Sequence, residues 1–207
     1  MAQASEAYTA PASEETLQRV AVRLKERNIE AVIVDSGDDA RRLVLEKVPS
    51  GAEVHSGKSR TLQDAGIMDL VLDPNRYDAL RPRYMKMDRQ TQAREIRKLI
   101  AGPDYMLGSV AAVTEDGILV AGSATASQLG PYAYTSGKVI LVVGSQKIVP
   151  DLDTALRRMR EYVLPWEDAQ VRPLVPTGSF VGKILIIERE WINGRLEVIL
   201  VRKPIGI

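Results

Sequence analysis

Apolar residues recur with two different spacings along the chain, and stretches with these spacings alternate. The first stretch follows Ser13, a residue suited to cap a helix, and its apolar residues fall three or four positions apart. These residues are Leu17, Val20, Ala21 and Leu24. Residues 31–35 then form a short β-branched run, and residues 40–47 return to helical spacing. This order predicts a helix, a strand and a second helix.

The next part of the chain predicts a strand, a loop of small residues and a short helix. The strand covers residues 53–55, the loop residues 56–60 and the helix residues 61–65. Residues 73–87 have no clear period and contain Pro74 and Pro82, so we expect irregular structure there. A longer helix is expected from Asp88 to Gly102.

A hairpin and a fully buried strand are predicted in the middle of the chain. Asp116-Gly117 suits a tight turn, and it separates apolar runs at residues 110–114 and 118–121. Residues 139–143 are apolar at every position, which is typical of a strand covered on both faces of a sheet. Residues 152–163 have helical spacing and predict the helix that follows this strand.

The last part of the chain predicts a second hairpin, in which Asn193-Gly194 lies between apolar runs at residues 184–187 and 196–201. Strands that alternate with helices indicate an α/β fold with a mostly parallel or mixed sheet flanked by helices. In this chain a β-hairpin is expected at the C-terminal end. The 207 residues suffice to bury one core without disulfides or metals. We therefore expect a flexible N-terminal tail at residues 1–12 and a single domain at residues 13–207.

Charge and hydropathy narrow the classes of function. The chain has 28 Lys and Arg residues against 27 Asp and Glu residues, and the formal net charge is +1. This balance gives no overall field that would attract nucleic acid or an anionic membrane. No run approaches the roughly 18 apolar residues of a spanning helix, and the first dozen residues lack the features of a signal peptide. We therefore expect a cytoplasmic protein that binds neither nucleic acid nor membrane.

The cysteine and histidine content limits metal chemistry. The chain has no cysteine, which excludes disulfides, thiolate nucleophiles and iron–sulfur clusters held by cysteines of this chain. His55 is the single histidine, so sites built from several histidines are also excluded. A hard ion such as magnesium, held by carboxylates, is the metal alternative that stays open. The sequence names no metal ligand and no cofactor.

Three loops that follow expected strands are candidates for ligand binding, because ligands of parallel α/β sheets bind beyond the carboxyl ends of the strands. The first loop combines small residues with cations and suits phosphate or carboxylate, although it lacks the P-loop spacing. The second is rich in hydroxyls, which either bind a ligand or cap the next helix. The third follows the most apolar strand, and its lysine either faces a pocket or is solvated. The candidates are Ser56, Lys58, Ser59 and Thr61 in the first loop, Ser123, Ser127 and Gln128 in the second, and Gly144 and Lys147 in the third.

Four further residues carry candidate chemistry with a strong structural alternative. His55 titrates near neutral pH and suits acid–base catalysis, but a lone histidine at a strand end is more often a structural hydrogen-bonder. Thr114 and Glu115 lead into the first hairpin turn. A place in that turn is enough to explain the Glu115 carboxylate without a catalytic or metal-binding role. Arg94 lies on the basic face of the helix after Asp88, and such a face is usually solvated and binds anions less often.

Several segments resemble the lactate-utilization (LUD) domain family in residue type, order and spacing, most closely its small single-domain members. The resemblance covers residues 13–207. The segments are Met87–Gln92 with Arg94-Glu95, Gly108–Val110 with Thr114–Gly117, Ser127–Leu129 with Pro131–Tyr134, Val142–Val149, Pro176–Phe180 and Asn193–Arg195. The resemblance implies the three-layer α/β architecture of the sugar-phosphate isomerases and CoA transferases, with ligands at the strand ends.

The resemblance also implies a function in the use of lactate or related organic acids. We expect a small metabolite with a carboxylate or phosphate group to bind at the strand-end loops. The resemblance implies no particular catalytic residue. Family members work with iron–sulfur proteins in lactate oxidation, so iron–sulfur oxidoreductases are expected partners. The alternative is a non-catalytic accessory subunit of an oxidoreductase complex, or a homo-oligomer. Trp166 and Trp191 are of a type enriched at interfaces, although core packing explains tryptophans more often.

Overall fold

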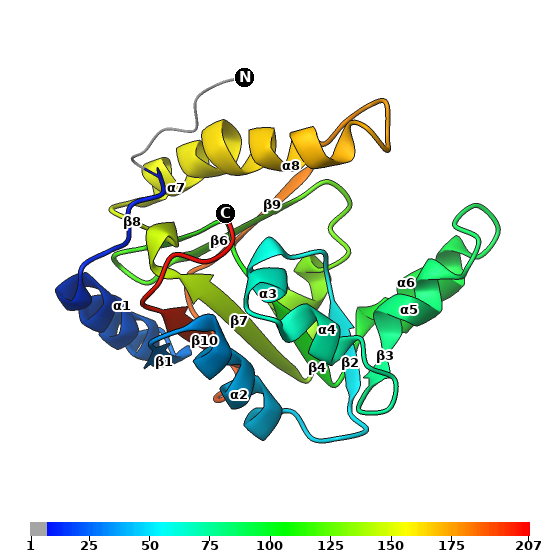
Figure 1. Cartoon of the computed structure of the whole chain (residues 1–207), viewed down its shortest axis with the longest axis horizontal. Coiled ribbons are helices and arrows are strands. Elements are labelled where there is room, and N and C mark those ends of the chain that lie inside the picture. Colours follow the sequence, from blue (N-terminus) through cyan, green and yellow to red (C-terminus); the bar gives the residue numbers. More distant parts are fainter. Residues whose placement is uncertain (1–7) are drawn as a thin grey trace.

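A six-stranded parallel sheet lies at the centre of the protein in the computed structural model, which describes residues 8–207 (Figure 1). The strand order is β1-β10-β7-β4-β2-β3, and every neighbouring pair is parallel. The strands are β1 (Glu30–Val34), β2 (Glu53–Ser56), β3 (Asp78–Ala79), β4 (Tyr105–Gly108), β7 (Lys138–Gly144) and β10 (Leu196–Val201). The expected α/β class with a mostly parallel sheet is confirmed.

The two faces of this sheet have different covers. One face packs against α2 (Gly37–Lys47), α3 (Arg60–Asp64) and α4 (Ile67–Val71), and the other against α1 (Glu14–Glu26) and a second sheet. Alternate residues of β7 point to the two sides: Ile140 and Val142 pack with the three helices, and Val139 and Leu141 pack with α1. This two-sided burial explains why residues 139–143 are apolar at every position.

The second sheet has four strands in the order β8-β5-β6-β9. The strands are β5 (Ala112–Thr114), β6 (Leu119–Ser123), β8 (Ile148–Val149) and β9 (Lys183–Ile187). β5 and β6 form the expected antiparallel hairpin, and Gly117 in its turn has a φ of 82°, which favours glycine. The outer face of the second sheet packs against α7 (Leu152–Arg158). This helix continues through η4 (Met159–Val163) into α8 (Leu164–Val171) (Figure 1). The sequence predicts β5, β6 and β9 but not β8, and it does not predict that these strands lie outside the central sheet.

Tyr8 lies in the stretch expected to be a flexible tail and contacts α7 and η4. Residues 1–7 of that stretch lie outside the described residues, but the hydroxyl of Tyr8 donates to Glu161 and its carbonyl oxygen accepts from Arg158. α1 begins as expected, because the Ser13 hydroxyl accepts the N–H of Thr16 at 3.1 Å. None of the helices within residues 8–207 is both long and apolar enough to cross a membrane.

Regular structure forms within residues 73–87, where we expected none. β3 and then α5 (Leu80–Met85) occupy this stretch, and Pro82 falls in the first turn of α5, where its missing N–H costs no helical hydrogen bond. α6 (Ala93–Ala101) begins later than expected, because the Asp88 carboxylate accepts the N–H of Gln90 in a turn before it. Figure 1 shows α5 and α6 side by side, projecting from the β3 edge of the sheet.

The expected C-terminal hairpin is wrong. Asn193-Gly194 does form a turn, with a φ of 71° at Gly194, but β9 belongs to the second sheet. β10 lies in the central sheet and pairs in parallel with β1 and with β7. All six residues of β10 are buried, as in a strand covered on both faces, whereas a hairpin strand on an open sheet alternates. The mostly apolar run at residues 196–201 was therefore a better guide than the turn beside it.

A buried ion pair holds the chain just before β10. The Arg195 guanidinium contacts the Glu190 carboxylate at 2.7 Å, and both side chains are buried. It also donates to the carbonyl oxygens of Pro131, Tyr132 and Ser136, in and beside the π-helical turn η2 (Pro131–Thr135). The entry to β10 is thereby fixed to the turn that carries Tyr132.

Replacing Arg195 is expected to destabilise the fold strongly. Arg195→Ala leaves the Glu190 carboxylate buried without its cation, and breaking a buried pair in this way costs about 3–5 kcal/mol. The matched control is Arg189→Ala, because Arg189 is exposed and donates to the Glu26 carbonyl oxygen. Urea unfolding should show a change of less than about 1 kcal/mol for the control. Equal losses in the two variants would contradict a structural role for the buried pair.

Candidate functional site

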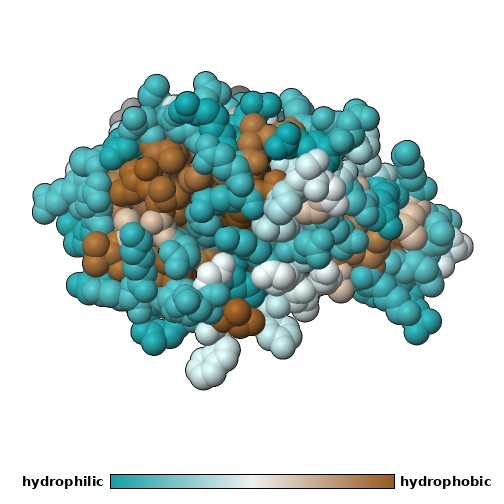
Figure 2. Space-filling view, turned by 90° about the horizontal axis from the view of Figure 1, so that it is seen from below, coloured by the Kyte–Doolittle hydropathy of each residue, from teal (hydrophilic) through white to brown (hydrophobic). Residues whose placement is uncertain are grey.

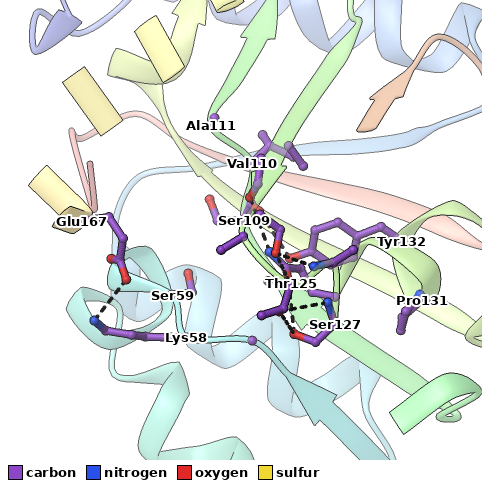
Figure 3. Close-up of a pocket in the computed structure, with 18 of the residues that line it drawn as sticks. Lys58, Ser59, Ser109, Val110, Ala111, Thr125, Ser127, Pro131, Tyr132 and Glu167 are labelled. Carbon is purple, nitrogen blue, oxygen red and sulfur yellow. Dashed lines mark hydrogen bonds and ion pairs between the residues drawn. The ribbon is translucent and has the colours of Figure 1, made fainter. Parts of the chain in front are cut away.

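A cavity of about 820 Å³ lies beyond the carboxyl ends of the central strands. Its wall is formed by the loop after β2 (residues 57–61), the end of β4 with the residues that follow it (108–111) and Lys147, which follows β7. The hydroxyl-rich loop after β6 and parts of α6 and α8 complete it. Figure 3 shows the labelled side chains from these loops converging from separate strands. A cavity of this size suits a small organic ligand.

Lys147 is buried in the cavity wall among oxygen atoms. Its side chain is 3 % exposed, and Nζ contacts Thr61 Oγ1 at 2.8 Å, Ser109 Oγ at 3.0 Å and the Val110 carbonyl oxygen at 3.2 Å. None of these partners is a carboxylate. Burial lowers the pKa of Lys147 from its usual 10.5 to about 7, and the neighbouring charge of Arg158 adds to this effect. Lys147 therefore changes charge near neutral pH.

Arg158 is a second buried cation behind the same wall. It is fully buried and donates to the carbonyl oxygen of Ala111, the residue after the lysine's partner Val110. Its guanidinium also stacks 5.1 Å from the centre of the Tyr162 ring. Burial lowers the pKa of Arg158 to about 10, so this group keeps its positive charge at neutral pH. That fixed charge disfavours the protonated form of Lys147.

The charged residues on the cavity wall are mostly cations. They are Lys58, Arg60, Arg81, Arg89, Arg97 and Lys147, and Glu167 is the single acidic residue among the described lining residues. Glu167 pairs with Lys58 at 3.3 Å (Figure 3), and Arg60 pairs with Asp64 at 2.6 Å. Arg81 is half-buried and donates to two neutral oxygens, those of the Tyr84 hydroxyl and the Ser56 carbonyl. The excess of cations favours an anionic ligand.

The hydroxyls of the loop after β6 are used mainly to hold that loop. Ser123 Oγ donates to Gln128 Oε1 at 3.0 Å and accepts the N–H of Ala126 at 2.9 Å. Ala126 has a φ of 69°, in the left-handed region, which costs a non-glycine residue about 1 kcal/mol. The hydrogen bonds of Ser123 stabilise this backbone conformation. Thr125 and Ser127 join by hydroxyl contact at 3.4 Å. These side chains cap no α-helix, so the capping alternative is wrong.

The structure brings seven of the candidate residues together on this wall. Ser59 also caps α3, because its hydroxyl accepts the N–H of Leu62. The loops after β2 and β6 meet where Gly57 packs against the Gln128 side chain. The candidates on the wall are Lys58, Ser59, Thr61, Ser123, Ser127, Gln128 and Lys147. Lys147 was expected either to be solvated or to face a pocket, and in the structure it faces the cavity.

Two candidates lie beneath the wall and do not line the cavity. His55 is fully buried, and its ring meets the Tyr84 ring edge-on with centroids 5.7 Å apart. Burial, followed by the charge of Arg81, lowers the pKa of His55 to about 4, so the imidazole is neutral at neutral pH. The buried Ser56 hydroxyl contacts the sulfur of Met68. Packing accounts for both residues. The structural alternative for the histidine was a hydrogen-bonder, but within residues 8–207 both ring nitrogens of His55 are buried without a hydrogen-bond partner.

The remaining four candidates are absent from the described lining. Arg94 is exposed on α6, and the Glu115 carboxylate pairs with Arg19 at 2.6 Å on the surface. The Thr114 hydroxyl accepts a backbone N–H from across the β5–β6 turn. Gly144 is packed so closely by the segment after β10 that a Cβ would overlap it. Within residues 8–207, no three His, Asp or Glu side chains are grouped to hold a metal ion.

The lining residues that were not recognised as candidates in the sequence include Arg81, Ser109 and Tyr132. Arg81 comes from the stretch expected to be irregular, and Ser109 is a single serine after β4. Tyr132 is buried, and its hydroxyl donates to the carbonyl oxygen of Ser109 at 3.3 Å. Burial raises the pKa of Tyr132, so it stays protonated. A Cβ at Gly108 would overlap the Tyr132 hydroxyl, which explains the glycine before Ser109.

The protein is an α/β protein with a parallel sheet. Its cation-rich cavity lies at the carboxyl ends of the strands, where proteins of this class commonly bind ligands. The model of the LUD domain family matches residues 17–201, so this chain belongs to the LUD domain family, as its sequence segments indicated. The crystal structure of a DUF162 family protein from Deinococcus radiodurans is similar in fold. The TM-score is 0.57 at 15 % identity, over 92 % of this chain and 99 % of that one. No curated protein matches the chain.

The buried lysine is expected to make stability depend on pH. Its pKa in the folded chain, about 7, is lower than the usual 10.5, so the unfolded chain binds more protons between these two values. The free energy of unfolding should therefore gain up to about 1.4 kcal/mol per pH unit from this group as pH rises through that interval. Lys147→Met removes the contribution. Urea unfolding of both proteins tests it: a difference in stability that does not change between about pH 7 and about pH 10 would contradict it.

Proposed function

We propose that this LUD domain binds a small metabolite with a carboxylate or phosphate group in the strand-end cavity. The observation that carries the proposal is the charge of the wall, where five permanently charged cations and the ionisable Lys147 lie with a single acidic side chain among the described lining residues. Cations gathered in a concave, partly apolar site raise the local concentration of anions. Membership of the LUD family supports placing the metabolite in the use of lactate or a related organic acid.

Arg81 is the residue that we assign to the anionic group of the ligand. It is half-buried on α5, and within residues 8–207 its guanidinium forms no ion pair with a carboxylate. A guanidinium presents a planar fork of donors that matches the oxygens of a carboxylate or phosphate. A bound anion would supply the counter-charge that this cation lacks in the chain itself.

The size of the cavity bears on the ligand. At about 820 Å³ it falls near the upper end of the range for sites that enclose whole small molecules, and lactate alone would fill a small part of it. The lining also includes Trp166, Phe180 and Ile96, which suit an apolar portion. The proposal therefore favours an organic acid with a further group attached over a free two- or three-carbon acid.

The alternative to ligand binding is the role of an accessory subunit. Large apolar side chains exposed on the surface favour this alternative. The Trp191 side chain is 94 % exposed beside the exposed Ile192, whereas Trp166 lines the cavity. Figure 2 shows apolar patches among hydrophilic residues on the face seen from below. Exposed tryptophan is characteristic of interface anchors. A copy of this chain or an iron–sulfur oxidoreductase would be the partner, since a chain without cysteine needs another protein to supply thiolate-bound clusters.

Isothermal titration with pyruvate, lactate, citrate and inorganic phosphate at low ionic strength tests the binding proposal. At least one of these anions should bind the wild-type protein, and Arg81→Met should weaken that binding about tenfold or more, because a charged hydrogen bond is lost. Arg83→Met is the matched control. Arg83 lies on the same helix, outside the cavity, and pairs with Asp78 at 2.8 Å.

Two results would contradict the assignment. Equal weakening by the Arg81 and Arg83 substitutions would indicate general screening of charge and not a site at Arg81. The absence of binding by all four anions would favour the accessory-subunit alternative. In that case size-exclusion chromatography of the wild type and of Trp191→Ser would show whether the exposed tryptophan holds an assembly together.

A further inference from the structure

Ser109 and Lys147 are held in direct contact on the cavity wall, with 3.0 Å between Oγ and Nζ. We propose that they form a nucleophile–base dyad, in which the Ser109 hydroxyl accepts an acyl group from a small ester or thioester. Hydroxyl nucleophiles activated by a lysine are a known solution for acyl transfer on unrelated folds. The dyad goes beyond anion binding and uses another part of the same cavity.

The partners of Lys147 determine where its lone pair points when the amine is neutral. A neutral amine has two N–H donors and one lone pair, and here it has three oxygen partners. The Val110 carbonyl oxygen can only accept a hydrogen bond, so it takes one N–H. The second N–H goes to one hydroxyl, and the other hydroxyl must donate its proton to the lone pair. One of Thr61 and Ser109 is therefore hydrogen-bonded as a proton donor to a base.

Access to the cavity distinguishes the two hydroxyls. Thr61 is 1 % exposed, and Gly206 packs so closely on it that a Cβ at that glycine would overlap Thr61 Oγ1. Ser109 is only half-buried, directly after β4, and Figure 3 shows it on the cavity wall beside Tyr132. An acyl carbon that approaches from the cavity therefore reaches the serine and not the threonine. Thr61 is left as a positioning residue that holds the lysine.

The protonation behaviour of Lys147 agrees with the role of a base. Burial lowers its pKa to about 7, and the charge of Arg158 acts in the same direction. A general base is most effective when its pKa lies near the pH at which it works. An ordinary exposed lysine would be protonated at neutral pH and could not accept the serine proton.

The proposed reaction balances without an added cofactor. Ser109 Oγ attacks the carbonyl carbon of the ester, and Lys147 Nζ takes the hydroxyl proton. The bond from the acyl carbon to the leaving oxygen or sulfur then breaks, and the ammonium returns the proton to that leaving group. Water, activated by the same lysine, hydrolyses the acyl-serine to the acid and regenerates the hydroxyl. With Arg81 as the proposed anion site, an acyl donor that also carries a carboxylate or phosphate would fit best.

The test is acylation of the full-length protein by p-nitrophenyl acetate, followed by p-nitrophenol release and by mass spectrometry of the intact chain and its peptides. We expect one acetyl group on Ser109 and a fast first turnover. Ser109→Ala should abolish this adduct. Lys147→Met should slow acylation about a hundredfold or more, which is the usual range for loss of a general base. Ser50→Ala is the control, since Ser50 is an exposed serine that bonds to the Arg76 carbonyl oxygen outside the cavity.

The Ser109 substitution decides the proposal even if the lysine variant does not fold, because Ser109 is half-buried and its hydroxyl can be removed without burying a charge. The pH profile of the wild type gives a second measure: acylation should rise through about pH 7, where Lys147 loses its proton. No adduct on Ser109, an unchanged rate in Ser109→Ala, or acetylation of Lys147 itself would overturn the dyad. The probe is a neutral ester, so failed acylation leaves the anion-binding result intact, and failed anion binding leaves acylation measurable.

Discussion

The insertion of β10 between β1 and β7 is the constraint on which the rest of the structure depends. β1 pairs with β10 and β10 pairs with β7, so the first strand of the chain joins the central sheet through the last one. All six residues of β10 are buried, and its five apolar residues contribute to the cores on both faces, while Glu197 pairs with Lys47. Pairing of elements this far apart in sequence is stable only because the apolar area that it buries offsets a large loss of chain entropy.

The walls of the cavity follow from this insertion on both sides of β10. Before the strand, Arg195 holds the turn that positions Tyr132 and, through it, the backbone of Ser109. After the strand, the chain lies over the end of β7, where Gln146 donates to the Ile205 carbonyl oxygen at 2.8 Å. The same segment packs through Gly206 on Thr61, a partner of Lys147, and the exclusion of Lys147 from water is the largest cause of its lowered pKa. The chemistry of the site is thus a consequence of how the last strand is placed.

Local patterns in the sequence predicted the elements, and long-range pairing explains what they missed. The apolar run at 139–143 predicted β7 and hence placed Lys147 at a strand end, where it lines the cavity. The turn at Asn193-Gly194 is real, yet its flanking strands belong to different sheets, which no local signal reveals. Arg81 comes from a stretch without a period, and its place in the site depends on a short helix that packs against β2 and α6. The burial of His55 depends on contact with Tyr84, which is remote in sequence.

The most direct test of this account is the protonation of Lys147 in the intact protein. Carbon-13 methylation of the lysines, with the Lys147 signal assigned by its loss in Lys147→Met, allows each amine to be titrated by NMR. We expect a pKa of about 7 for Lys147, well below the usual value of a lysine side chain. A Lys147 signal that titrates together with the exposed lysines would contradict the claim that the fold holds a dry, ionisable amine at the cavity wall.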